Sequence, residues 1–170
     1  MADEIVNKVA QSNLVSIDLE KFYPAGARHE FDLADWLYEG LILREKDFRE
    51  RAKNYDWAKH QNAHVAVYCS ADAIVPLWAF MLVSSQLQPF ASTIVEGNLE
   101  KLESVLFRNW CDTHDFSQYA GKPMIIKGCS NKPIPTDAFV EFVHRAQPHV
   151  KSIMFGEPCS TVPVYKKPKT

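Results

Sequence analysis

The sequence predicts an α/β fold with a mostly parallel sheet covered by helices on both faces, and two observations lead to this class. First, the chain contains a tandem βαβ duplication, because residues 56–97 and 115–156 share one pattern. Each copy opens on an Asp-aromatic pair, has an apolar run followed by Cys-Ser and a helical stretch, and closes with Gln-Pro, a second apolar run and a glycine. Second, strands and helices alternate strictly within each copy, which is typical of parallel sheets with right-handed crossovers.

Residues 1–55 lie outside the duplication and are predicted to form an N-terminal strand-helix elaboration. Residues 14–19 alternate apolar and polar side chains and end before a Pro-Ala-Gly turn, which indicates a strand. Asp32 is suited to cap a following helix. The apolar residues of that helix recur at helical spacing: Leu33, Trp36, Leu37 and Leu41. Residues 45–55 are highly charged and are expected to form a second helix.

The duplicated part of the chain is predicted to contain four strands and three helices. The strands are expected at residues 65–69, 93–96, 124–128 and 152–155, and the helices at residues 73–88, 99–113 and 137–146. Asp72 is suited to cap the first of these helices, and Pro76 then falls in its first turn, where proline is tolerated. The chain has no linker rich in Gly, Ser or Pro, so we expect a single domain over residues 1–170.

Charge and hydropathy exclude several classes of partner. Nineteen basic residues against 21 acidic residues give a net charge of -2, which offers no electrostatic basis for binding nucleic acid. The longest apolar stretch, residues 73–83, is too short to cross a bilayer. The N-terminus carries no apolar signal region. We therefore expect a cytoplasmic protein with neither a nucleic-acid nor a membrane partner.

Three Cys-Ser pairs follow predicted strands: Cys69-Ser70, Cys129-Ser130 and Cys159-Ser160. The carboxyl ends of parallel strands meet at one edge of a sheet, and open α/β sheets bind ligands at that edge. If the strand order is the common 2-1-3-4, the two copies meet along their first strands, so Cys69 faces Cys129 and Cys159 can reach the same crevice. A different strand order would separate the thiols.

Three converging thiols could form a metal site. A helix N-terminus stabilises a thiolate over a thiol, and three thiolates can hold zinc, or iron alone or in a cluster. Asp72 or water would supply the fourth ligand. The serines of the three pairs could hydrogen-bond to a sulfur or a cofactor. The sequence contains no Cys-x-x-Cys spacing, so the alternative remains that these cysteines are small buried hydrophobes, as we expect for Cys111.

Two other classes of function stay open. A thiol enzyme or sulfur carrier would use one cysteine as the nucleophile, although no arginine follows Cys69 or Cys129 to close an anion-binding loop. The histidines give no obvious catalytic base and are expected to be structural or exposed. A protein–protein interaction module would instead use Trp36, Leu37 and Leu41 to bind a partner or a second copy of the chain.

Segments 69–76, 127–130 and 156–163 together resemble an uncharacterised bacterial family that is catalogued only as a domain of unknown function. The resemblance covers nearly the whole chain, including residues 41–49. It implies no activity, because none has been assigned to the family. Genes for similar proteins lie near iron–sulfur assembly genes, which implies an iron–sulfur assembly partner. The resulting hypothesis is a metal-binding accessory protein with a three-thiolate site for zinc or iron.

Overall fold

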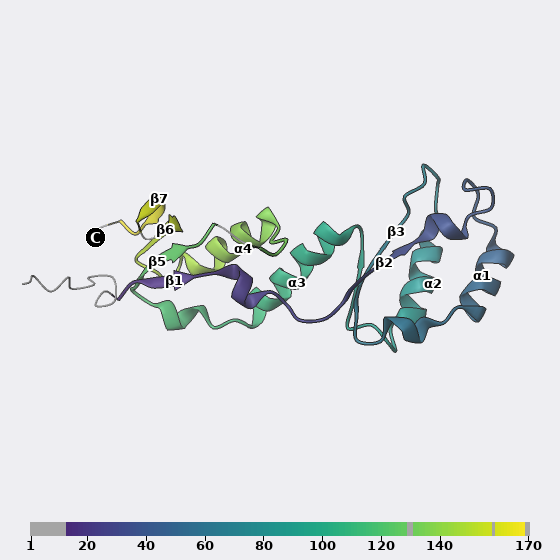
Figure 1. Cartoon of the computed structure of the whole chain (residues 1–170), viewed down its shortest axis with the longest axis horizontal. Helices are drawn as coiled ribbons and strands as arrows, with labels where there is room; N and C mark the ends of the chain where they lie inside the picture. The colour runs from purple at the N-terminus through teal and green to yellow at the C-terminus, as the bar shows by residue number, and fades with distance from the viewer. Residues whose placement is uncertain (1–12, 129–130, 158, 169–170) are drawn as a thin grey trace, which may run out of the picture. The chain divides into compact units, whose positions relative to one another are not determined.

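The computed structural model describes residues 13–128, 131–157 and 159–168, and these residues divide into two compact units. We call Ala25–Leu106 the three-stranded unit, and the described residues before Ala25 and after Leu106 the four-stranded unit. Helices lie alongside mostly parallel strands in both units (Figure 1), so the predicted α/β class is confirmed. The strands form two sheets instead of one. The assignment of the whole chain to a single domain stays a prediction.

The three-stranded unit contains a wholly parallel sheet with the strand order β2-β3-β4. Its strands are β2 (Arg28–Asp32), β3 (His64–Tyr68) and β4 (Thr93–Glu96), and its helices are α1 (Glu45–Asn54) and α2 (Leu77–Leu87). Both faces of the central strand β3 are covered. Val65 and Val67 share a core with Phe48 of α1 and with α2, whereas Ala66 packs against the first half of α3 (Leu99–Thr113).

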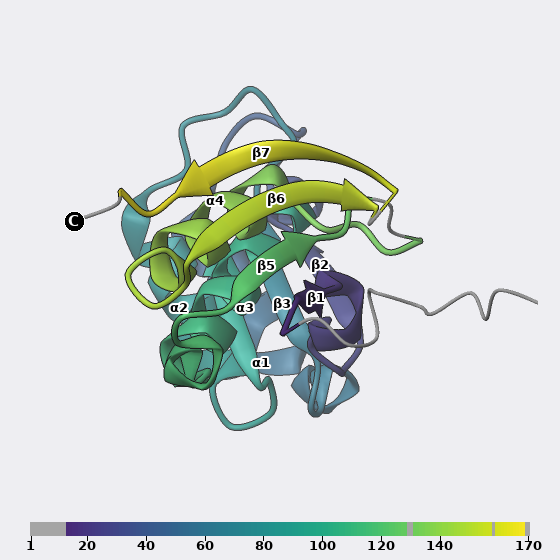
Figure 2. The same cartoon turned by 90° about the vertical axis from the view of Figure 1, so that its left-hand side faces the viewer.

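The four-stranded unit contains a mixed sheet with the strand order β1-β5-β6-β7 (Figure 2). Its strands are β1 (Val15–Ile17), β5 (Pro123–Ile126), β6 (Ser152–Glu157) and β7 (Ser160–Lys166), and its own helix is α4 (Thr136–Ala146). The first three strands are parallel, and β7 runs antiparallel to β6. Phe142 of α4 packs with Ile126 and Ile153 of the sheet, and Phe107 from the second half of α3 joins this core.

Apart from β7, the described elements of the two units follow the same order, and from α1 to β4 the equivalent residues of the four-stranded unit lie 59 positions later, as in Phe48 and Phe107 or Gly97 and Gly156. Each unit also has two short 3₁₀ helices: η1 (Leu19–Phe22) and η4 (Phe116–Tyr119), or η2 (Leu33–Trp36) and η3 (Trp57–His60). An aspartate caps each of the four by accepting a hydrogen bond from the N–H two residues later: Asp18, Asp32, Asp56 and Asp115. The repeated arrangement therefore extends upstream of residues 56–97 and 115–156.

The predicted helix after Asp32 is wrong, although Asp32 does cap the short η2. Residues 28–32 form β2, which pairs with β3. The ring of Trp36 lies 5.1 Å from the rings of Phe31 and Phe48, measured between centroids, and Leu37 is buried. Leu33, Trp36 and Leu37, three of the apolar residues at helical spacing, thus pack into the interior beside β2, whereas Leu41 does not. Of the interaction surface predicted from Trp36, Leu37 and Leu41, Leu37 is buried, Trp36 is partly buried and Leu41 is exposed, so binding of a partner through this surface stays a prediction.

The other predicted helices are found, with one difference at the start of α2. The bounds of α3 are those predicted. α1 ends one residue earlier than predicted, and α4 begins one residue earlier than predicted. α2 begins at Leu77 because Pro76 is its extended N-cap residue, and proline disfavours a helical conformation in the residue before it. Asp72 therefore does not cap this helix. No helix among the described residues is long and apolar enough to span a bilayer.

The strand β7 was not predicted from the sequence, which indicates no strand beyond residue 155. Pro163 interrupts the alternation of apolar and polar residues, and lysines follow it. In the structure Pro163 lies opposite Met154, at a register shift of the β6–β7 pair. Proline is tolerated in sheets on edge strands and at bulges, and β7 provides both conditions. The proline and the lysines therefore prevent recognition of this edge strand from the sequence pattern.

Candidate functional site

Cys69 directly follows β3 and is half-buried against the core of the three-stranded unit. Its Sγ lies 3.7 Å from the backbone oxygen of Ala71, to which it donates. The neighbouring Ser70 is exposed, and its backbone N–H donates to Asp32 Oδ1 at 3.0 Å. Burial raises the pKa of Asp32, but hydrogen bonds from Ser70 and from the N–H of Ala34 outweigh this effect and hold the pKa below its usual value. The Cys69-Ser70 turn is thereby tied to the end of β2.

Cys159 lies in the other unit, at the turn between β6 and β7, and is exposed. Ser160 is also exposed and lies opposite Glu157 in the β6–β7 pair. Lys127, which follows β5, forms an ion pair with Glu157 across the same edge of the sheet, at 3.7 Å between Nζ and Oε2. A lysine and a carboxylate therefore lie close to the segment that carries Cys159.

Cys129 and Ser130 lie outside the described residues. The residue before them, Gly128, lies against the ring of Phe155, where a Cβ atom would come within 2.4 Å of the ring. The residue after them, Asn131, donates its backbone N–H to Glu20 Oε2 at 3.2 Å. By the repeat of 59 positions, the equivalent of Cys69 is Gly128 and not Cys129. The two Cys-Ser pairs are therefore displaced by one residue from each other.

The proposed strand order 2-1-3-4 is wrong, because β3 pairs with β2 and β4, whereas β5 pairs with β1 and β6. Cys69 thus follows a strand of one sheet and the segment after β5 follows a strand of the other, so the predicted pairing of these two strands does not occur. The segments after β5 and β6 do follow adjacent parallel strands. Asp72 is exposed in the three-stranded unit. Among the described residues, no three histidine, cysteine, aspartate or glutamate side chains lie together in a way that could hold a metal ion.

Cys111 is buried on α3 within the core of the four-stranded unit. Burial, together with the charge of Glu141, raises the pKa of this thiol to about 11. Cys111 is therefore a thiol at neutral pH and packs as a small hydrophobe, as expected from the sequence.

A histidine pair that was not anticipated lies at the edge of a cavity in the three-stranded unit. His29 of β2 and His60 of η3 face each other, with 3.0 Å between their Nδ1 atoms. His60 Nε2 lies 3.0 Å from the hydroxyl of Tyr55. The cavity has a volume of about 490 Å³ and is lined by six residues: Arg28, His29, Glu30, Tyr55, Lys59 and His60.

The histidine pair can share only one proton between the two facing nitrogens. Burial, followed by the positive charges of His29 and Lys59, lowers the pKa of His60 to about 4, so His60 is neutral at neutral pH. A second feature of the cavity lining is Arg28, which donates to both carboxylate oxygens of Glu103, at 2.7 and 3.1 Å. The contacts of His60 with Tyr55 and with His29 form a hydrogen-bonded chain that could relay a proton to the cavity. Sequence reasoning missed the pair because the strand that carries His29 was not predicted.

Comparison with known proteins yields a family without an assigned activity. No curated protein and no solved structure matches the chain. A family model described as "Protein of unknown function (DUF2480)" matches residues 3–167, nearly the full length of the sequence. The chain therefore belongs to the DUF2480 family of proteins of unknown function.

Proposed function

We propose that this protein binds a soft metal ion, zinc or iron, through thiolates at the carboxyl edge of the four-stranded sheet. The observation that carries the proposal is the parallel pairing of β5 with β6. Neighbouring parallel strands end at the same edge of a sheet, about 4.8 Å apart, so the segments that follow β5 and β6 leave from adjacent points. In the sequence, these two segments contain Cys129-Ser130 and Cys159-Ser160.

The groups described around this edge favour metal binding by thiolates. Zinc and iron bind to thiolates, and the ion-paired side chains of Lys127 and Glu157 place charged groups at the same edge of the sheet. The carboxylates of Glu157 and Glu20 contact groups of this edge and could complete the coordination. Cys159 is exposed, so a partner protein could reach its sulfur. An exposed thiolate ligand suits an accessory protein that passes on a metal ion or an iron–sulfur cluster in the reducing cytoplasm.

Cys69 has a different environment and is a weaker candidate ligand. It belongs to the three-stranded unit, is half-buried, and donates its S–H to its own turn at Ala71. Cys129 and Cys159 therefore form the basis of the proposed site. Cys69 and Asp72 remain candidates for a third and a fourth ligand, and substitution tests their contribution directly.

Metal content tests the proposal. The protein is purified without oxygen, loaded with Zn²⁺ or with Fe²⁺ and sulfide, and desalted, and bound metal is measured together with the absorbance spectrum. Cys129→Ser and Cys159→Ser should each remove most of a near-stoichiometric metal ion without unfolding the protein. Cys111→Ser is the matched control, because Cys111 is buried in the hydrophobic core of the four-stranded unit, and the metal content of this variant should equal that of the parent protein.

The remaining outcomes separate the alternatives. Loss of metal in Cys69→Ser would add that thiolate to the site. Metal content that is unchanged in both Cys129→Ser and Cys159→Ser, or absent from the parent protein, would overturn the proposal. In the second case, a single cysteine that reacts rapidly with iodoacetamide near neutral pH would instead favour a thiol enzyme or a sulfur carrier.

A further inference from the structure

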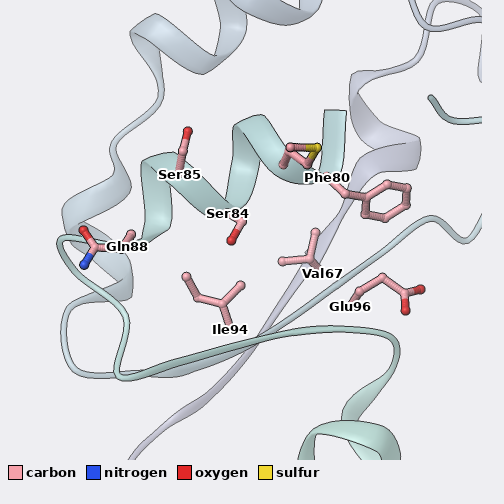
Figure 3. A pocket seen from close by; sticks show the side chains of 8 residues that line it. Val67, Phe80, Ser84, Ser85, Gln88, Ile94 and Glu96 are labelled. Carbon is pink, nitrogen blue, oxygen red and sulfur yellow. The ribbon is translucent and has the colours of Figure 1, made fainter. Parts of the chain in front are cut away.

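An apolar pocket lies between α2 and the edge strand β4 of the three-stranded unit (Figure 3). Its volume is about 480 Å³. It is lined by eight residues from the sheet and the helix: Val67, Phe80, Met81, Ser84, Ser85, Gln88, Ile94 and Glu96. Figure 3 shows the small side chain of Ser84 pointing from α2 toward the sheet, where Val67 and Ile94 lie. The pocket therefore exposes part of the apolar layer between helix and sheet.

The four-stranded unit shows what fills the equivalent space. The position equivalent to Ser84 is Val143, and the position equivalent to Glu96 is Phe155. Val143 and Tyr165 both pack against the core of that unit, and Phe155 makes an edge contact with Phe139 at 6.1 Å between ring centroids. Tyr165 belongs to β7, the strand that covers the outer edge of β6. The pocket beside β4 thus lies where two larger side chains and a further strand are found in the other unit.

The outer edge of β4 and the adjoining face of α2 are uncovered among the described residues. The described sheet ends at β4, so the polar backbone groups on one side of this strand have no strand partner. On α2, Leu77 is 80% exposed and Met81, one turn later, is 71% exposed. An edge strand flanked by exposed apolar side chains is a typical site of strand addition by another chain.

We propose that this edge joins two copies of the chain, with β4 of one copy pairing antiparallel with β4 of the other across a twofold axis at Ile94. Gly97 donates its N–H to Val67 of β3, and backbone groups alternate along a strand, so the N–H of Ile94 points away from β3. A pair of Ile94 residues can therefore exchange hydrogen bonds across the axis. The pairing would join the two three-stranded sheets into one six-stranded sheet.

The edge is chemically complementary to itself in this register. Ile94 meets Ile94 of the second copy on the side of the pocket. The two flanking pairs match Thr93 with Val95 and Ser92 with Glu96, so a hydroxyl faces each carboxylate and no like charges are opposed. Met81 lines the same pocket as Ile94, so the second copy would bring its own Met81 to the apolar surface of the interface. Isologous pairing of this kind is the commonest symmetry of soluble oligomers, which favours a second copy as the occupant.

Sedimentation velocity of the full-length chain from about 1 μM to about 1 mM tests the proposal. We expect a concentration-dependent dimer. Met81→Lys and Ile94→Lys should each raise the dimer dissociation constant about a hundredfold, because each places a charge on the apolar surface of the interface, and Ile94→Lys also brings two like charges together at the axis. The matched control is Val140→Lys, since Val140 is the equivalent of Met81 on α4, is 63% exposed, and belongs to neither β4 nor α2. Circular dichroism verifies that each variant is folded.

A charge-reversal experiment tests the position of the axis. Ile94→Lys and Ile94→Glu should each be monomeric, and an equimolar mixture should form a heterodimer, because lysine then faces glutamate. A parent protein that remains monomeric over the whole concentration range would overturn the proposal. It would instead favour a strand from a different protein as the partner of β4. A dimer that Met81→Lys and Ile94→Lys both leave intact would overturn it as well. Neither result bears on the metal content measured for the cysteine variants.

Discussion

The strand β6 in the four-stranded unit is paired on both sides, with β5 and β7, whereas its equivalent β4 in the three-stranded unit pairs with β3 alone among the described residues. The cores of the two units are alike. Phe48 and Phe107, at equivalent positions, are both fully buried, and the 3₁₀ helices are capped in the same way. Within this duplicated chain the interior and the turns are retained, while the sheet edges and the cysteine-bearing loops differ. Functional differences between the units are therefore expected at edges and loops.

A second difference lies within a contact that both units keep. In the three-stranded unit Tyr55 precedes His60 and the two side chains are hydrogen-bonded at 3.0 Å. In the four-stranded unit the order is reversed, and His114 is hydrogen-bonded to Tyr119 at 2.9 Å. The tyrosine and the histidine have exchanged places without loss of the contact. Only His60 has a second histidine, His29, against its other ring nitrogen.

The largest effect is expected from the two equivalent core phenylalanines. Phe48→Ala and Phe107→Ala each remove a fully buried ring and should lower the free energy of unfolding by about 3–5 kcal/mol. Urea denaturation measures the loss of stability. Hydrogen exchange followed by mass spectrometry locates it, because Phe48→Ala should speed exchange first within Ala25–Leu106, and Phe107→Ala in the residues around it.

The exposed equivalents Arg49 and Arg108 provide controls for this experiment. Their replacement by alanine should change the free energy of unfolding by less than about 0.5 kcal/mol. Faster exchange spread evenly over the whole chain in Phe48→Ala would contradict the division of the fold into two units that open separately.

The equivalent glycines Gly97 and Gly156 should respond unequally to alanine. Both have a positive φ, +133° and +121°, which strains any other residue by about 1–3 kcal/mol. A Cβ on Gly156 would also come within 2.5 Å of the backbone oxygen of Ser160 in β7, whereas the atoms nearest to a Cβ on Gly97 belong to the flexible side chain of Lys101, with Cδ at 2.5 Å. Thermal denaturation should therefore show a larger loss for Gly156→Ala. Equal losses would mean that β7 can shift away from β6.

The stability of the three-stranded unit should fall in mildly acidic solution because of His60. The pKa of His60 is about 4 in the folded chain against an ordinary value of 6.5, so between these values only the unfolded chain takes up the proton. This contribution to stability is complete above about pH 6.5 and decreases as the pH falls toward about 4. Urea denaturation at about pH 7 and about pH 5 measures the decrease.

Replacing His60 or His114 by glutamine shows which of the two histidines causes this pH dependence of stability. His60→Gln should flatten it more than His114→Gln, because the positive charges of His29 and Lys59 add to burial only at His60, while Asp115 opposes the effect of burial at His114. An identical pH dependence in the parent protein and in His60→Gln would exclude His60 as its source.

The strands and helices of the duplication could be predicted because hydrophobic periodicity determines them locally. α3 and β4 have the predicted bounds. Sheet membership could not be predicted, because it depends on which distant segment reaches each central strand. β2 pairs with β3 and β1 pairs with β5, and neither pairing leaves a signal in the sequence of the repeats. β7 was missed because Pro163 disrupts the alternation that would mark a strand.

The candidate site was harder to predict than the fold, for the same reason. The position of each Cys-Ser pair near a strand end follows from local pattern, but convergence of the three pairs required one continuous sheet. The chain forms two sheets, so only the segments of Cys129 and Cys159 follow neighbouring strands. The pair of His29 and His60 could not be foreseen, because it depends on the pairing of β2 with β3.

The smallest effect concerns the exchanged tyrosine and histidine. In the four-stranded unit, His114→Tyr and Tyr119→His each break one hydrogen bond and should each cost about 1 kcal/mol, whereas the double variant restores the bond in reversed order and should recover most of the loss. A double-mutant cycle by urea denaturation measures this coupling. The same exchange of Tyr55 and His60 should recover less, because His60 Nδ1 then no longer contacts His29. Equal recovery in the two units would show that the contact between His29 and His60 contributes nothing to stability.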